Sequence, residues 1–343
     1  MKTTIRALLA LLAVLALAVG LAACGGGSDE GTGGDQATSD GTNEGAANEG
    51  PGAGKSTVEV IEANPANKGK KITVGSKNFD EQYILGEIYA QSLEAAGFDV
   101  EKQLNLGSEQ IAFRALKRGD IDAYPEYTGT ALTSFYRVKI DEAPRDKDEA
   151  FSLLQKELKA DQITALPQTG FENSYRLTST KETAEKYGNP KTITEVAEAA
   201  GSDASLSGFP ECRQRTDCLL GLNNVYDWDP KFISSQGQYA DLDSGQADFT
   251  MGFSTDGALS TGKYVTYEDD KGLYPPYFVT LLTSNEGMEA MGQNGVEIIE
   301  RVQEPLTEEV MQELNSRVTL DKQEPEQVAK DYLSESGFVE ASS

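Results

Sequence analysis

Hydrophobic positions change their spacing repeatedly between residues 70 and 340. Short apolar or alternating runs predict strands, and apolar residues three or four positions apart predict helices. In the first half of this region the predicted strands are 71–75, 100–106, 121–124 and 163–166. The predicted helices lie between Asp80 and Gly97, between Ser108 and Gly119, and over 147–160. The alternation predicts an α/β fold with helices on both faces of a sheet.

The second half repeats this alternation and then becomes helical. Strands are predicted at 206–209, 231–234, 247–253 and 264–267, and helices at 286–302, 307–318 and 325–336. Thr192 followed by Glu195 fits a capping box at a helix start. Pro125 is expected at the first position of a helix, where its missing N–H costs nothing.

Two extended stretches interrupt the alternation and predict passages between two lobes. Residues 170–176 lie between the two αβ patterns, and residues 274–282 lie before the terminal helices. We interpret both as crossing strands, with Tyr175 facing a cleft. This gives a discontinuous first lobe, 70–172 plus 281–343, and a continuous second lobe, 173–280.

The N-terminus has the pattern of a targeting segment. Lys2 and Arg6 precede the apolar run 7–19, which is too short to span a bilayer as a helix. The run ends in LAAC at 21–24, which resembles the lipobox of bacterial lipoproteins. Residues 1–23 are therefore expected to be a lipoprotein signal peptide and Cys24 a lipidated first residue. The alternative is an ordinary secretory signal with a cysteine nearby.

Residues 24–69 are expected to tether the folded part to the membrane. Gly, Ser, Thr, Asn, Asp and Glu dominate 25–54, a composition that cannot offset its ordering entropy and predicts disorder. A flexible coil of this length has a root-mean-square reach of roughly 40 Å.

Charge and composition exclude several classes of function. The 56 acidic residues outnumber the 30 basic ones, for a formal net charge of −26, which argues against nucleic-acid binding and favours a soluble monomer. The chain has no histidine. Ser-His and Cys-His catalysis and His-ligated metal sites are thereby excluded. We expect no enzyme activity, no cofactor and no metal.

The two remaining cysteines, Cys212 and Cys218, are expected to form a disulfide in an oxidising compartment. The alternative is a pair of free thiols. Zinc is not expected, because no further Cys or His is present to complete a tetrahedral site. The bridge would stiffen a short loop that presents Arg213 or Arg215.

Several motifs together resemble one known family. They are GSKNF at 75–79, EQYILGE at 81–87, GDIDAYPEYTGT at 119–130, STDG at 254–257, EDD at 268–270 and PPY at 275–277. This combination is similar to the substrate-binding lipoproteins of glycine betaine/carnitine/choline-type osmoprotectant ABC transporters. The resemblance implies a type II periplasmic-binding-protein fold, in which two lobes with two crossing strands close over a ligand.

The resemblance also implies a ligand site. In the family, aromatic rings hold a quaternary ammonium group, and basic and hydroxyl groups hold a carboxylate. The matching aromatic positions are Tyr127, Tyr175, Tyr277 and Phe253. At the position of Phe253, the family usually has a tyrosine. The matching carboxylate positions are Lys77, Thr130 and Arg215, with Arg213 as the alternative.

Physical chemistry supports this assignment and offers plainer alternatives. A trimethylammonium group donates no N–H hydrogen bond, and a desolvated cation–π contact contributes about 2 kcal/mol. Without the resemblance, however, any one of the 14 tyrosines is more simply interpreted as a half-buried packing residue, and Lys77 as a solvent-exposed residue. Asp120, Asp122 and Asp256 are interpreted as turn or capping acids, and Glu126 as structural.

We therefore expect an extracytoplasmic, membrane-anchored protein that captures an osmoprotectant and delivers it to an ABC permease. One rival is the same fold with an amino-acid ligand, which requires an acid placed against a primary ammonium. A second is a secreted hydrolase with two carboxylates about 5–10 Å apart. A third is an adhesion module, which would present a flat apolar patch. The sequence does not distinguish betaine from choline or carnitine.

Overall fold

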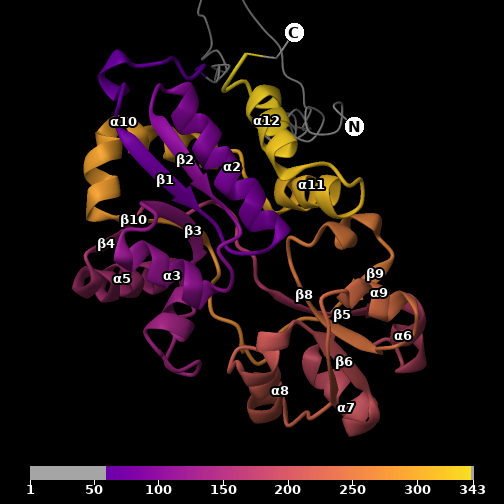
Figure 1. Cartoon of the computed structure of the whole chain (residues 1–343). Coiled ribbons are helices and arrows are strands. Elements are labelled where there is room, and N and C mark those ends of the chain that lie inside the picture. The colour runs from indigo at the N-terminus through magenta and orange to yellow at the C-terminus, as the bar shows by residue number, and fades with distance from the viewer. Residues whose placement is uncertain (1–58, 341–343) are drawn as a thin grey trace, which may run out of the picture.

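The computed structural model describes residues 59–340, which build two lobes on two five-stranded sheets (Figure 1). Predictions about the signal segment, Cys24 and the tether up to residue 58 lie outside the described residues. Within residues 59–340, no helix combines the length and the apolar character needed to cross a membrane.

The sheet of the first lobe has the strand order β2-β1-β3-β10-β4. Its strands are β1 (Lys71–Gly75), β2 (Asp99–Gln103), β3 (Ala123–Tyr127), β4 (Ile163–Ala165) and β10 (Val279–Ser284). The first three are parallel, whereas β10 runs antiparallel to both β3 and β4. Strand β10 thus enters the middle of this sheet after the chain has built the other lobe.

The sheet of the second lobe has the order β7-β6-β8-β5-β9. Its strands are β5 (Tyr175–Thr180), β6 (Ser205–Gly208), β7 (Lys231–Ser234), β8 (Phe249–Phe253) and β9 (Tyr264–Thr266). Here β6, β7 and β8 are parallel, and β5 is antiparallel to β8 and β9. In both sheets, the strand that arrives from the opposite lobe is the antiparallel fourth strand, so the two lobes share one topology.

The two crossings run side by side in opposite directions. Glu172 and Phe278 form an isolated antiparallel bridge, and the Asn173 amide donates to the Tyr277 carbonyl over 3.1 Å. The crossing segments are shorter as regular strands than expected, because β5 begins only at Tyr175 and β10 only at Val279. Strand β10 also starts two residues before the predicted lobe boundary at 281. The exact boundaries of the lobes stay a prediction.

Helices cover both sheets (Figure 1). Those attached to the first lobe are α2 (Asp80–Ala95), α3 (Glu109–Arg118), α4 (Thr128–Thr130), α5 (Lys147–Leu158), α10 (Asn285–Gln303), α11 (Glu308–Thr319) and α12 (Pro325–Glu335). Helix α2 buries Ile84, Leu85 and Ile88 completely. Helix α3 ends at Gly119, whose φ of 72° is the left-handed conformation that glycine adopts readily.

The second lobe carries shorter helices around its own core. They are α6 (Lys181–Lys186), α7 (Ile193–Ala200), α8 (Leu219–Tyr226) and α9 (Gln238–Asp243). The Thr192 hydroxyl caps α7 by accepting from the Glu195 amide over 3.2 Å, which is one half of the predicted capping box. The Glu195 carboxylate accepts from the Lys191 amide over 2.6 Å instead of from the Thr192 amide. Trp228 and Phe249 meet edge to face in the core, with ring centres 5.6 Å apart.

Short tight turns supplement these helices. They are the 3₁₀ segments Pro65–Asn67, Lys159–Asp161, Gly201–Asp203, Pro210–Gln214 and Gly257–Thr261. Ala131–Phe135, which follows α4, is instead a wider π-helical segment.

The prediction that Pro125 starts a helix is wrong, because Pro125 lies inside β3 opposite Leu281 of β10. The ladder between β1 and β3 contains only the pair Val74–Ala123. On the side of β3 that faces β1, no strand hydrogen bond therefore requires the N–H that proline lacks, and proline fits in the strand.

Candidate ligand-binding site between the lobes

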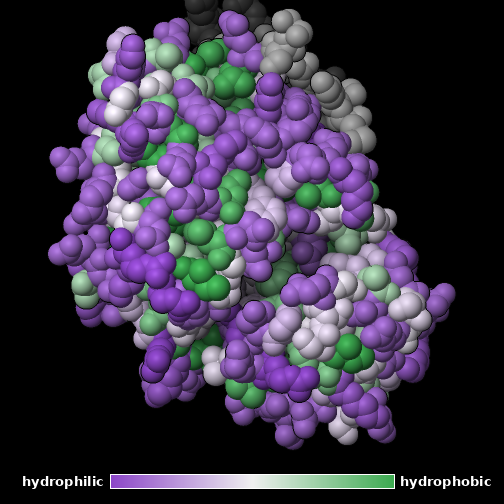
Figure 2. All heavy atoms as spheres, viewed as in Figure 1, coloured by the Kyte–Doolittle hydropathy of each residue, from purple (hydrophilic) through white to green (hydrophobic). Residues whose placement is uncertain are grey.

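A cavity of about 670 Å³ lies between the two lobes. In the space-filling view the surface is hollowed at this junction (Figure 2). The structure brings to the cavity wall all seven residues for which a ligand contact is predicted: Lys77, Tyr127, Thr130, Tyr175, Arg215, Phe253 and Tyr277. Since they come from both lobes, a ligand held here would contact both at once.

Tyr175 is the centre of a group of aromatic side chains that we call the aromatic cluster: Tyr175, Phe209, Phe253, Tyr274 and Tyr277. The ring centre of Tyr175 lies 5.1 Å from Phe253, 5.2 Å from Tyr274, 5.5 Å from Tyr277 and 6.3 Å from Phe209. All except Tyr274 line the cavity. Phe209 was not anticipated from the sequence, because it lies in none of the motifs that carry the resemblance.

Backbone register and one glycine position these rings. Tyr175 and Phe253 are direct partners in the antiparallel pair β5–β8, so their side chains point to the same face. Tyr277 arrives from the return crossing and packs over Gly129. A Cβ atom at Gly129 would lie 2.7 Å from the Tyr277 ring, too close for any other residue without displacing the ring.

Tyr127 lies in the same cavity but not in the aromatic cluster. Its ring stacks on Phe79 at 6.2 Å, and the Lys77 ammonium lies 4.3 Å from its centre. The Tyr127 hydroxyl donates to Glu81 over 2.7 Å. One face of Tyr127 is therefore already occupied by a cation that belongs to the protein.

Lys77 is buried together with Glu126, and the two form an ion pair. Glu126 also accepts hydrogen bonds from the Tyr124 hydroxyl at 3.0 Å and from the Tyr127 amide at 2.8 Å. Burial raises the pKa of Glu126, although Lys77 opposes the rise. Glu126 is thus the buried counter-ion of Lys77, which agrees with its expected structural role.

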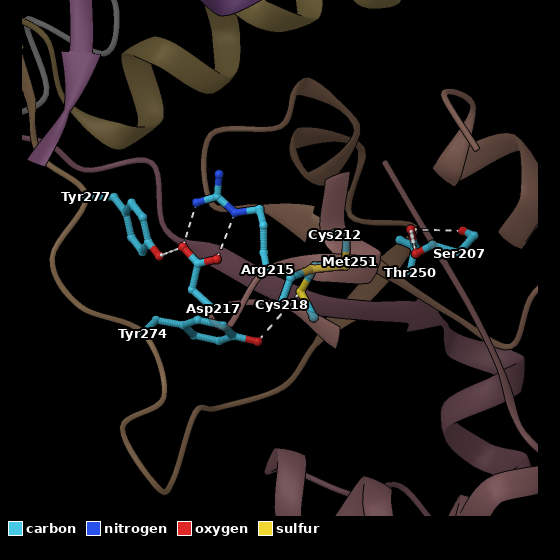
Figure 3. The surroundings of a disulfide bond; sticks show 9 residues. All are labelled: Ser207, Cys212, Arg215, Asp217, Cys218, Thr250, Met251, Tyr274 and Tyr277. Carbon is cyan, nitrogen blue, oxygen red and sulfur yellow. Dashed lines mark hydrogen bonds and ion pairs between the residues drawn. A yellow bond between two sulfur atoms is a disulfide. The ribbon is translucent and has the colours of Figure 1, made fainter. Parts of the chain in front are cut away.

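Arg215 lines the cavity, whereas Arg213 does not. Figure 3 shows the Arg215 side chain directed at Asp217. The Arg215 guanidinium donates two hydrogen bonds, of 2.7 and 2.6 Å, to the Asp217 carboxylate. The Tyr277 hydroxyl donates to the same carboxylate over 2.5 Å. Arg213 instead stacks on Phe232, 4.9 Å from the ring centre. Asp217 therefore links the arginine to the aromatic cluster while neutralising its charge.

The disulfide holds this arrangement at its base. The structure joins Cys212 and Cys218, with Cα atoms 5.2 Å apart. Within the bridged loop, the Arg215 amide donates to the Cys212 carbonyl and the Cys218 amide donates to the Arg215 carbonyl. Arg215 is thus fixed from both sides at the backbone.

Glu81 of α2 is the centre of a hydrogen-bond network on the opposite wall. Besides Tyr127, it accepts from the side-chain amide of Asn173 at 2.8 Å and from that of Asn315 at 2.8 Å. Asn173 lies on the first crossing and Asn315 on α11. The sequence analysis assigned no site role to Glu81, although Glu81 opens the motif at 81–87. It also missed Asn173 and Asn315, because a single Asn inside a helix or a crossing carries no distinguishing pattern.

Asp256 does more than the turn role assigned from the sequence. It accepts from the Phe253 amide and from the Tyr239 hydroxyl, both over 2.8 Å, which is the expected turn. Asp256 also lines the cavity. Burial raises its pKa to about 6 despite these hydrogen bonds, and the nearby Glu81 adds to the rise.

Within residues 59–340, no group of acidic or cysteine side chains is arranged to hold a metal ion. The chemistry available at the cavity consists of aromatic faces, hydrogen-bond acceptors and paired charges. Such a wall binds and orients a small molecule.

Comparison with known proteins identifies the family. Residues 70–335 match the sequence profile described as the substrate binding domain of an ABC-type glycine betaine transport system. A glycine-betaine-binding protein of Pseudomonas aeruginosa is 30% identical over 278 residues, covering 77% of this chain and 87% of the relative. The crystal structure of a glycine betaine/carnitine/choline ABC transporter protein is similar with a TM-score of 0.65 at 26% identity, covering 78% of this chain and 99% of that one.

A further relative is the ergothioneine transport permease/ergothioneine binding protein of Helicobacter pylori, which is 28% identical over 274 residues and 78% of this chain. This chain spans about half of that protein, since the match covers 48% of its length. The two-lobe α/β fold, the matched profile and these relatives agree: the chain belongs to the family of substrate-binding domains of ABC-type glycine betaine transport systems.

Proposed function

We propose that the aromatic cluster of this substrate-binding protein holds the quaternary ammonium group of an osmoprotectant, which the protein then delivers to an ABC permease. The observation that carries the proposal is the position of Tyr175, Phe209, Phe253 and Tyr277 around one wall of a cavity shared by both lobes. Aromatic faces attract a methylated cation that donates no hydrogen bond.

The cation–π contacts expected from the aromatic cluster are strong enough to account for micromolar binding. Each desolvated cation–π contact contributes about 2 kcal/mol, and a micromolar complex requires about 8 kcal/mol. Three or four rings therefore supply most of the affinity. Arg215, Lys77 and Thr130 would orient a carboxylate, where the ligand has one, through hydrogen bonds that their present partners leave available.

A direct test is calorimetry with glycine betaine, proline betaine, carnitine, choline and ergothioneine, with a set of amino acids as controls. We expect binding to at least one quaternary ammonium compound with a dissociation constant in the micromolar range or below. Binding of an amino acid, without heat from any of the five quaternary ammonium compounds, would favour the rival ligand class instead.

We further propose that the protein acts outside the cytoplasm as a monomer tethered by lipid on Cys24. The lipobox-like run at 21–24 and the glycine-rich segment that follows it support this proposal. We expect Cys24→Ser to move the protein from the membrane fraction to the soluble fraction of cells. An unchanged membrane fraction would contradict the anchor, and a dimer in light scattering would contradict the monomer.

A further inference from the structure

The wall of the cavity that contains Glu81 is chemically unlike the aromatic cluster. It consists of Glu81, Asn173, Thr255, Asp256 and Asn315, which we call the acceptor subsite. All five line the cavity. They come from helix α2, the first crossing, the loop after β8 and helix α11. The subsite therefore belongs to both lobes, as the aromatic side of the cavity does.

Three buried oxygen atoms in this subsite have no hydrogen-bond partner among the described residues: Asn173 Oδ1, Thr255 Oγ1 and Asn315 Oδ1. Their residues are only 9%, 1% and 5% exposed. The amide nitrogens of both asparagines already donate to Glu81, so their oxygens are left to accept. A buried polar group without a partner is destabilising, which favours an occupant that supplies donors.

The charge of the subsite points to the same kind of occupant. Glu81 and Asp256 form no ion pair within residues 59–340, whereas Lys77 and Arg215 are neutralised by Glu126 and Asp217. Both of these cavity-lining cations are thus compensated, whereas the buried Glu81 and the partly buried Asp256 are not. The third cation that lines the cavity, Lys322, lies near Asp80. A cation with N–H donors would satisfy both the charge and the three unpaired oxygens.

A trimethylammonium group does not satisfy them, because it has no hydrogen to donate. The cavity also exceeds what the smallest betaine fills, since about 300–1,000 Å³ is the range that encloses much larger ligands and this cavity measures about 670 Å³. One molecule with two different ends fits both walls.

We propose that the acceptor subsite binds a protonated amine, or another N–H-bearing cationic group, at the far end of the ligand whose quaternary ammonium lies in the aromatic cluster. The inference rests on the proposed function and narrows it to one substrate class. The preferred ligand is an extended quaternary ammonium compound with a second, hydrogen-bond-donating cationic end.

Two ligands that differ only in the second end test this. Nε-trimethyllysine carries a quaternary ammonium and an α-ammonium, and 6-(trimethylammonio)hexanoate lacks only the α-ammonium. Calorimetry on the wild-type protein is expected to give at least tenfold tighter binding of Nε-trimethyllysine. Equal affinities would overturn the subsite while leaving the proposed function standing.

Variants assign the preference to the subsite. Asp256→Asn keeps an acceptor for the Phe253 amide but removes the charge, and Thr255→Val removes one unpaired oxygen at constant shape. Each is expected to reduce the preference for Nε-trimethyllysine at least threefold, with little change for the hexanoate. Asp243→Asn, which removes a surface acid paired with Lys263, is the matched control and should leave the preference unchanged.

The outcomes separate the two claims. If choline or glycine betaine binds but Nε-trimethyllysine does not, the subsite proposal fails alone. If no quaternary ammonium compound binds, the proposed function fails and the subsite proposal fails with it. Circular dichroism and thermal melting establish that each variant is folded, and the wild-type comparison stands whatever the variants do.

Discussion

At the scale of single residues, Tyr175 determines the character of the site. Four other rings surround it, and it is almost completely buried. Burial raises the pKa of Tyr175 well above its ordinary value, so the hydroxyl stays protonated. The negative potential that attracts a cation is that of the neutral aromatic face.

Removing the Tyr175 ring is expected to weaken binding of the preferred quaternary ammonium ligand at least tenfold. Tyr175→Ala deletes the ring, and Tyr175→Phe is the matched control, which keeps the aromatic face and should stay within about threefold of wild type, since the face and not the hydroxyl makes the cation–π contact. Isothermal titration calorimetry measures both variants. Wild-type affinity in Tyr175→Ala would contradict the proposed role.

Asp256 is expected to make the ligand-free protein less stable at neutral pH. Its pKa is raised from 3.8 to about 6 by burial, so the folded state binds the proton more tightly than the unfolded state. Stability from this group is therefore present below pH 4 and is lost as the pH rises to 6, by up to about 3 kcal/mol.

Denaturant unfolding of wild type and Asp256→Asn at pH 5 and pH 7 checks this sign. The variant should be more stable than wild type at pH 7, and the difference should narrow at pH 5, where wild-type Asp256 is mostly protonated. A difference that stays constant between the two pH values would show that Asp256 does not titrate in this range.

Sequence reasoning found the aromatic residues of the site more readily than its polar residues. Tyr127 and Tyr277 lie in motifs that resemble a family, and Tyr175 lies on a predicted crossing strand. Glu81 and Asn315 lie 234 positions apart in the sequence, and they form their hydrogen bond only because α2 and α11 approach each other in the fold. The counter-ions Glu126 and Asp217 were also unforeseen as partners of Lys77 and Arg215, because pairing across β-strands and loops depends on register that composition does not reveal.

At the scale of elements, the loop between Cys212 and Cys218 connects structure to binding. The bridge holds the backbone on both sides of Arg215, and Arg215 holds Asp217, which accepts from Tyr277. A change in this short loop therefore reaches the aromatic cluster through two side chains (Figure 3).

Replacing both cysteines by serine is expected to lower the free energy of unfolding by about 2 kcal/mol, which the chain-entropy model gives for so short a loop. Thermal melting under non-reducing conditions measures the change, with reduced wild-type protein as the second comparison. Ligand affinity should fall as well, because Arg215 loses its fixed position. An unchanged melting temperature would refute the stabilising role.

The sequence predicted the elements well where local periodicity decides them. Strands Lys71–Gly75 and Lys231–Ser234 have the expected bounds, and the three terminal helices agree within one residue at each end. Pro125 was misjudged, because proline at a helix start and proline at an unpaired strand edge look alike in sequence. The tertiary position of β10 beside β3 determines the outcome.

At the scale of the whole molecule, contacts between the lobes accompany the cavity. Asn315 of α11 donates to the Thr255 carbonyl over 2.8 Å, and Gln312 donates to the Ser254 carbonyl over 2.7 Å. Gly257 allows this approach, since a Cβ atom there would lie 2.5 Å from the Ser316 amide nitrogen. A ligand that contacts both lobes would favour this closed arrangement over an open one.

Gly257→Ala is expected to weaken every ligand by a similar factor of at least ten, because the added methyl group collides with the backbone of α11 and opposes closure. Small-angle scattering should show a smaller ligand-induced compaction than in wild type. Gly237→Ala is the matched control, since a Cβ atom at Gly237 would lie at an ordinary 3.9 Å from Ala240. Wild-type affinity and compaction in Gly257→Ala would argue against closure through this contact.

The most direct test of the account is to remove the charge of the ligand while keeping its shape. Choline and its neutral carbon analogue 3,3-dimethylbutan-1-ol form one such pair, and glycine betaine and 3,3-dimethylbutanoate form another. For the pair whose quaternary ammonium member binds, calorimetry should show at least a hundredfold weaker binding of the carbon analogue, equivalent to about 2.7 kcal/mol. Equal affinity of the cation and its analogue would show that the rings provide only an apolar surface and would contradict recognition of a quaternary ammonium group.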